Sequence, residues 1–201
     1  VAKAFMTDMA YESCNLGQMV FGGHGYVREW GQEQLVRDVR IAQIYEGTNG
    51  IQALDLLGRK VVANKGQFLE TYFTEIRAFI EKNNKQQALA GFIKPLAGAL
   101  EKLKAVTDLI ITLQKTDKDM VGASASDYLA AFGLLSYAHM WALMAEKASK
   151  QTSDDFYQAK LYVGNFFISR ILPRIDSHIN ALEAGSGSLM LMPESLFNYN
   201  Y

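Results

Sequence analysis

Residues 128–145 read YLAAFGLLSYAHMWALMA, an uncharged stretch between Asp127 and Glu146. Its large side chains recur at helical spacing, at Tyr128, Phe132, Leu135, His139 and Leu143. The stretch reaches the low end of membrane-spanning length, but its tyrosines, serine, histidine and glycine lower its hydropathy. We therefore predict a helix buried within a bundle of other helices, and no integral membrane segment.

The remainder of the sequence also favours helices. It lacks the alternation of apolar and polar residues, closed by Gly or Asn turns, that marks β-strands. The fold class expected is therefore all-α, a helical bundle. The expected helices cover residues 2–20, 32–44, 49–61 and 68–80, followed by three long amphipathic segments near 86–115, 124–150 and 154–184.

Three features are expected to interrupt or follow the long segments. Pro95 and Pro173 each remove a backbone donor inside an expected helix and should kink or interrupt it. Residues 185–188, Gly-Ser-Gly-Ser, predict a flexible link. The apolar residues after it, 189–192 and Phe197, predict a tail that docks onto a surface.

Charge and cysteine content narrow the function classes. With 20 basic and 21 acidic residues the net charge is -1, and no basic stripe is interleaved with aromatics, so nucleic-acid binding is not expected. Cys14 is the sole cysteine; it cannot form an internal disulfide and is read as inert packing, which fits a reducing, cytoplasmic location. The chain starts at Val1 in what reads as the middle of a helix, which indicates a fragment of a longer protein.

Two segments could carry chemistry. One is Ile44-Tyr45-Glu46-Gly47-Thr48-Asn49-Gly50-Ile51-Gln52, and the other is Gly22-Gly23-His24-Gly25-Tyr26. Glu46 between an aromatic residue and a glycine is expected at a helix end in a partly apolar pocket, where desolvation makes a carboxylate a usable base. On the pattern alone, the favoured interpretation is a solvated glutamate at a helix terminus.

The neighbouring residues also have two interpretations. Thr48 and Asn49 open a helix whose free N–H groups suit a phosphate, although a simple N-cap explains them too. The glycines allow positive φ and close approach of a ligand, or only a tight turn. His24, His139 and His178 lack partners at ligand spacing, so no metal site is expected.

The run Tyr45-Glu46-Gly47-Thr48, the glycine cluster and Arg37-Asp38 together resemble the C-terminal signature of the FAD-dependent acyl-CoA dehydrogenases. The resemblance is close over residues 1–62, interpreted as part of that family's C-terminal helical domain. Residues 63–201 look like the extra helical domain that some bacterial members append. The resemblance implies that an all-α domain and a flavin-covering β-domain precede Val1.

The resemblance also implies roles. Glu46 would be the catalytic base that removes the α-proton of an acyl-CoA thioester, with Tyr45 and Gly47 beside the substrate. Thr48 would contact FAD.

In the family, the glycine loop reaches the FAD of a neighbouring subunit, which implies this role for Gly23. A glutamine three residues before the first glycine helps there, but here that position is Met19, and Gln18 stands one residue earlier. Gly50 replaces a glutamine that often contacts FAD.

Two functions follow as hypotheses. In the first, the parent protein oxidises acyl-CoA to trans-2-enoyl-CoA in fatty acid β-oxidation and passes electrons to an electron-transfer flavoprotein, as a homo-oligomer. In the second, the chain is a non-catalytic helical interaction module of a degenerate relative. The departures at Met19 and Gly50 favour the second, and the intact residues 45–48 favour the first.

Overall fold

The computed structural model describes residues 1–197, and every regular element in that range is helical. The prediction of an all-α fold is confirmed. The α-helices are α1 (Ala2–Val20), α2 (Gln32–Arg40), α3 (Asn49–Leu54), α4 (Gln67–Asn83), α5 (Ala90–Leu113), α6 (Met120–Ala148), α7 (Asp155–Phe166), α8 (Ile175–Glu183) and α9 (Gly187–Met190).

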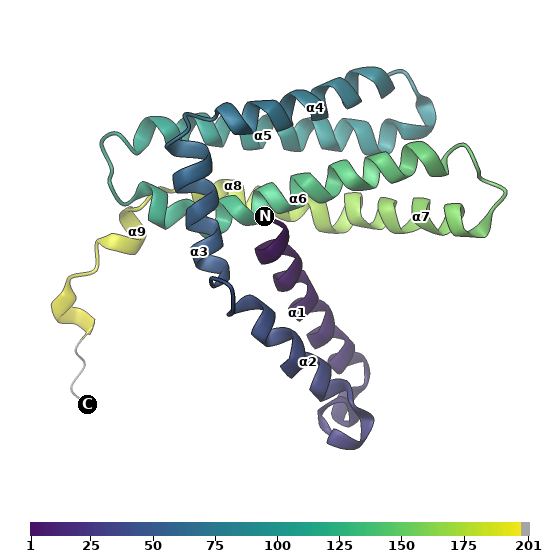
Figure 1. Cartoon of the computed structure of the whole chain (residues 1–201), viewed down its shortest axis with the longest axis horizontal. Coiled ribbons are helices and arrows are strands. Elements are labelled where there is room, and N and C mark those ends of the chain that lie inside the picture. Colours follow the sequence, from purple (N-terminus) through teal and green to yellow (C-terminus); the bar gives the residue numbers. More distant parts are fainter. Residues whose placement is uncertain (198–201) are drawn as a thin grey trace.

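Helix α6 is the centre of the fold. Helices α3, α5, α7 and α8 all pack against it, and α4 pairs with α5 at the outer side of the bundle (Figure 1). Tyr128, Leu135 and Ala142 on α6 are fully buried. By length and composition α6 could cross a membrane, yet 56% of its apolar window is buried inside the structure. The prediction of a helix buried within a bundle is therefore confirmed.

Helices α1 and α2 form a hairpin that projects away from this bundle (Figure 1). At its tip the chain turns through two short 3₁₀ segments, Gly22–Tyr26 and Arg28–Trp30. At its base, the ring of Phe5 is buried against Gly133 of α6 and meets Tyr137 edge-on at 5.0 Å. A Cβ on Gly133 would overlap that ring, so the glycine makes this close joint possible.

Helix α3 continues without a break into a π-helical stretch, Asp55–Val62, whose Leu57 and Val61 are buried. The chain then turns at Lys65 and Gly66, both with positive φ, and enters α4. This matches the helix expected over residues 49–61.

The two internal prolines behave differently. Pro95 lies near the start of α5, and the helix runs through it uninterrupted. Pro173 lies in a 3₁₀ segment, Leu172–Arg174, which follows a π-helical segment, Phe167–Ile171. The segment expected over residues 154–184 is therefore divided into α7 and α8, as a proline without a backbone donor requires.

The end of the described chain differs from the expectation. Residues 185–188 are not a loose link, because Ser186 is buried and its hydroxyl donates to Asp117 at 2.6 Å, and α9 starts directly afterwards. The apolar tail does not dock on this chain: Leu189, Leu191 and Phe197 are 63%, 79% and 69% exposed. The prediction of a loose link is therefore wrong, whereas the docking of the tail onto a surface stays a prediction.

Candidate functional site

Glu46 lies in the loop between α2 and α3, after a 3₁₀ turn at Ile41–Gln43. Its φ is +54°, and the following Gly47 has φ +83°. The side chain of Glu46 is exposed, and that of Tyr45 is 52% exposed. The apolar pocket expected around this carboxylate is therefore not formed by residues 1–197, which leave the carboxylate open to solvent.

The backbone of this loop is held by side chains from both sides. Gln52 on α3 donates to the carbonyl of Glu46 at 3.0 Å. Lys3 on α1 donates to the carbonyl of Gly47 at 2.8 Å. The N–H of Glu46 itself has no hydrogen-bond partner within residues 1–197. Glu46 thus presents a carboxylate and a free amide donor from a backbone that is fixed at its neighbouring carbonyls.

Thr48 caps α3, because its hydroxyl accepts from the N–H of Ile51 at 3.4 Å. Thr48 and Gly50 are exposed, and Asn49 is half-buried. Nothing lies within 4 Å of where a Cβ on Gly50 would stand. The start of α3 therefore offers open backbone donors, as the phosphate interpretation requires, and the simple N-cap is present as well.

Asn49 joins the start of α3 to α1. Its side-chain oxygen accepts from Lys3 at 2.8 Å, and its side-chain nitrogen donates to Asp8 at 2.6 Å and to the carbonyl of Ala4 at 3.1 Å. Asp8 also accepts from Gln43 at 2.6 Å. One amide therefore ties the site loop to the first turns of α1.

The glycine cluster lies at the tip of the hairpin. Only Gly22 has positive φ, +59°, whereas Gly23 has open space where a Cβ would stand. Gly25 is buried, and a Cβ there would overlap the carbonyl of Gln18. The side chain of Gln18 donates to the carbonyl of Gly25 at 3.1 Å, while Met19 is 78% exposed. Gln18 therefore stabilises the tip through one of its two side-chain N–H groups.

The two candidate segments are not brought together. The loop with Glu46 and Thr48 lies at the base of the hairpin, and Gly23 lies at the opposite end (Figure 1). These residues therefore suit two separate ligand sites of one subunit, or sites in different subunits.

Arg37 and Asp38 are exposed, and within residues 1–197 neither forms an ion pair. Asp38 instead accepts from Gln34 at 2.6 Å. The sequence predicts structural ion pairs for this dipeptide beneath the site loop, and none forms within residues 1–197. No cluster of His, Cys, Asp or Glu able to hold a metal ion occurs in the described part of the chain.

Two histidines occupy the bundle. His178 on α8 contacts a carboxylate oxygen of Asp127 at 2.8 Å. His139 on α6 is buried beside Tyr72 and Phe79. Burial lowers the pKa of His139, and the Glu75 carboxylate opposes that shift. Both histidines are remote from Glu46 in sequence and belong to the bundle.

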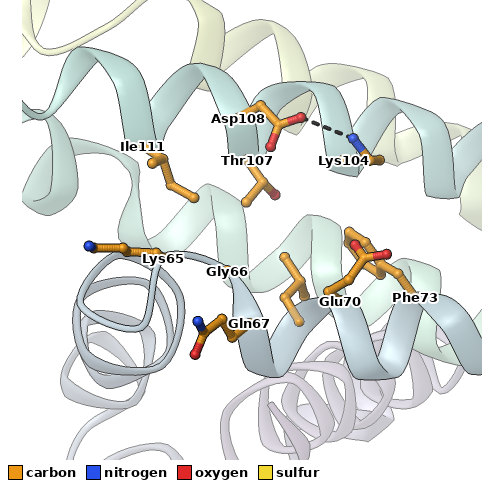
Figure 2. Close-up of a pocket in the computed structure, with 10 residues that line it drawn as sticks. Lys65, Gly66, Gln67, Glu70, Phe73, Lys104, Thr107, Asp108 and Ile111 are labelled. Carbon is orange, nitrogen blue, oxygen red and sulfur yellow. Dashed lines mark hydrogen bonds and ion pairs between the residues drawn. The ribbon is translucent and has the colours of Figure 1, made fainter.

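A surface pocket of about 280 Å³ lies between the start of α4 and α5 (Figure 2). Its floor includes Thr107, which is bonded to Tyr128 and to the carbonyl of Leu103, and its rim includes an ion pair between Lys104 and Asp108 at 3.1 Å. None of the residues identified from sequence lines it. We interpret it as a groove between helices.

The sequence did not reveal the residues that hold the site loop. Lys3 and Asp8 are separated from Asn49 by more than 40 positions, and nothing local marks them. Gln52 was quoted with the motif but given no role.

Two family models match most of the chain. Residues 1–62 match the family model "Acyl-CoA dehydrogenase, C-terminal domain", and residues 72–193 match "Acetyl-CoA dehydrogenase C-terminal like". Among similar proteins is a butyryl-CoA dehydrogenase of Syntrophomonas wolfei, 25% identical over 98% of this chain and 33% of its own length.

Two further relatives give the same picture. A 3-methylmercaptopropionyl-CoA dehydrogenase of Ruegeria pomeroyi is 31% identical over 94% of this chain and 33% of its own length. A broad-specificity linear acyl-CoA dehydrogenase of Mycobacterium tuberculosis is 28% identical over 98% of this chain and 34% of its own length. The chain spans about a third of the length of the curated relatives it matches.

Proposed function

Because the chain belongs to the acyl-CoA dehydrogenase family and corresponds to the C-terminal third of its relatives, we propose that the whole protein oxidises an acyl-CoA to the trans-2-enoyl-CoA. The observation that carries the proposal is the geometry of Glu46. One residue offers an exposed carboxylate and an unbonded amide N–H, from a loop fixed by Gln52 and Lys3.

In the proposed reaction, the carboxylate of Glu46 removes a proton from the carbon next to the thioester carbonyl. A flavin held at Thr48 and the open start of α3 would supply the acceptor for the hydride that leaves the adjacent carbon, and the two carbons would become doubly bonded. The thioester oxygen gains negative charge as the proton leaves, and we propose that the N–H of Glu46, which has no partner within residues 1–197, stabilises it. One such donor is worth roughly 3 kcal/mol in the transition state.

The residues present fit a flavin in two places. Thr48 and the open start of α3 suit a phosphate or polar edge of the cofactor, and Gly23 leaves its backbone open to a flat ligand. These positions are at opposite ends of the hairpin. We propose that they serve cofactors of different subunits, which makes the protein a homo-oligomer.

The hairpin also exposes a large apolar surface that a longer protein would cover. Its exposed large hydrophobics include Met19, Val20, Tyr26, Trp30, Leu35 and Ile41. Exposed patches of this kind mark interfaces. We propose that residues 1–62 complete the catalytic domain with segments outside this chain, that residues 63–201 form an appended helical domain, and that the protein is cytoplasmic and delivers its electrons in β-oxidation to an electron-transfer flavoprotein.

The test uses the full-length protein, scanned for oxidised-flavin absorbance and titrated anaerobically with acyl-CoAs of several chain lengths. Wild type and the matched control Glu81→Gln, an exposed acid on α4, should lose flavin absorbance on titration. Glu46→Gln should keep FAD bound but not bleach. A colourless protein that cannot be reconstituted with FAD would leave a helical scaffold in place of the enzyme.

A further inference from the structure

We propose that Lys3, Asp8 and Asn49 form a clamp that positions Glu46 for proton abstraction without touching the substrate. This inference rests on the proposed function, since it assigns these residues a part in the same site. The clamp joins the loop at the start of α3 to the first turns of α1.

The loop needs such support because its backbone is strained. Glu46 has φ +54°, a left-handed conformation that costs a residue with a side chain on the order of 1 kcal/mol or more. Such a conformation persists only where the surroundings over-determine it. Gln52 donates to the carbonyl of Glu46, and Lys3 donates to the carbonyl of Gly47. The two carbonyls belong to consecutive peptide units of the loop.

Asn49 is held in one orientation by opposite charges. The Lys3 ammonium donates to its side-chain oxygen at 2.8 Å, and the Asp8 carboxylate accepts from its side-chain nitrogen at 2.6 Å. Charge-assisted hydrogen bonds are roughly twice as strong as neutral ones. The second N–H of the same nitrogen is shared between the hydroxyl of Thr7, at 3.0 Å, and the carbonyl of Ala4, at 3.1 Å. The amide cannot flip without placing its nitrogen against the ammonium.

Lys3 is the element that connects the clamp to the base. Its ammonium binds both the side chain of Asn49 and the carbonyl of Gly47, the residue after Glu46. Lys3 is half-buried, and Phe5 beside it is anchored on α6. Through α1, these contacts fix the position of the Glu46 carboxylate relative to the helical bundle.

Loss of the clamp should change catalysis more than binding. A displacement of about 1 Å in a reacting group costs roughly 100-fold in rate. We therefore expect Lys3→Met and Asn49→Leu to lower kcat by roughly 10- to 100-fold, with KM changed by less than about threefold. Lys3→Arg keeps the cation and should retain more activity than Lys3→Met.

The experiment compares these variants in the full-length flavoprotein by steady-state kinetics and by hydrogen exchange of peptides covering residues 44–52. Flavin content and melting temperature report that each variant is folded. The control is Lys102→Met, which removes the same charge from an exposed ion pair with Asp176 between α5 and α8. Faster exchange at residues 44–52 with reduced kcat in the Lys3→Met and Asn49→Leu variants, and neither in the control, supports the clamp.

The outcomes separate the two proposals. A wild-type protein that never bleaches its flavin with any acyl-CoA overturns the proposed function, and with it the catalytic role of the clamp. A wild type that turns over, beside Lys3→Met and Asn49→Leu variants with unchanged kcat and unchanged exchange, overturns the clamp alone. Should Asn49→Leu fail to fold, the comparison of Lys3→Met with Lys3→Arg decides.

Discussion

Gly133→Ala should destabilise the protein although it replaces a glycine in the middle of a helix. In an exposed helix interior this change stabilises by about 0.5–1 kcal/mol, because glycine loses more backbone entropy on folding. At position 133 the new methyl would overlap Cγ and Cδ2 of Phe5, the base of a buried ring that cannot swing away freely. Overpacking of this kind costs about 1–3 kcal/mol.

The matched control is Gly98→Ala in α5, where nothing lies within 4 Å of the new Cβ and the site is exposed. Gly98→Ala should raise the free energy of unfolding by about 0.5–1 kcal/mol. The difference between the two variants then isolates the overpacking, about 1–3 kcal/mol.

Equilibrium urea unfolding followed by circular dichroism measures both variants. In a Phe5→Ala background the ring is absent, so Gly133→Ala should become stabilising like Gly98→Ala. Phe5→Ala alone should cost about 3–5 kcal/mol as a buried Phe truncation. Equal unfolding free energies for Gly133→Ala and Gly98→Ala in the wild-type background would refute the close joint between α1 and α6.

Three further predictions concern the bundle. Tyr128→Phe should lower the free energy of unfolding by about 1 kcal/mol, because Thr107 keeps its hydrogen bond to a backbone carbonyl. Thr107→Val should lower it by more, about 1–3 kcal/mol, because it leaves the buried hydroxyl of Tyr128 without a partner. Urea unfolding at pH 7 compares the two variants. Burial lowers the pKa of His139 in the folded protein, so the free energy of unfolding should fall as pH drops below about 6.5, by at most about 1.4 kcal/mol per pH unit. His139→Leu should flatten that slope when unfolding is measured between pH 7 and 5. The hydrogen bond from Lys82 holds the pKa of Glu146 below its usual value, which stabilises the folded protein above about pH 4.5. Lys82→Met should remove this contribution to the free energy of unfolding. The same dependence of unfolding free energy on pH in wild type and variant at acid pH would exclude the effect.

The sequence predicted the helices well because their apolar periodicity is local. Residues 128–145 on α6 are the clearest case, since their spacing alone indicated a buried core helix. The division near Pro173 was signalled by the proline itself, whereas Pro95 is accommodated in the opening turns of α5. The apolar tail is exposed on this chain, because apolar character alone does not determine which surface a segment covers.

The candidate site was only partly predictable. Glu46 and Thr48 were identified from their pattern, and the structure puts them in a loop and at a helix start as expected. The exposure of Glu46 could not be predicted, because burial depends on what packs over the loop. Lys3 and Asp8 were missed for a related reason: their bonds to Asn49 exist only once α1 and α3 lie side by side.

The hairpin of α1 and α2 is packed on α6 near one end, at Phe5, and its other end projects from the bundle (Figure 1). Helix α1 has 19 residues, so about 28 Å separate its ends at 1.5 Å per residue. Val20 lies 15 residues beyond Phe5, about 22 Å along the helix, so a tilt of about 10° at Phe5 would move the end of α1 by about 4 Å. The loop of Glu46 is bound to Lys3, close to Phe5, and would move much less. Any change in the tilt of the hairpin would therefore alter the position of the glycine tip far more than the position of the Glu46 carboxylate.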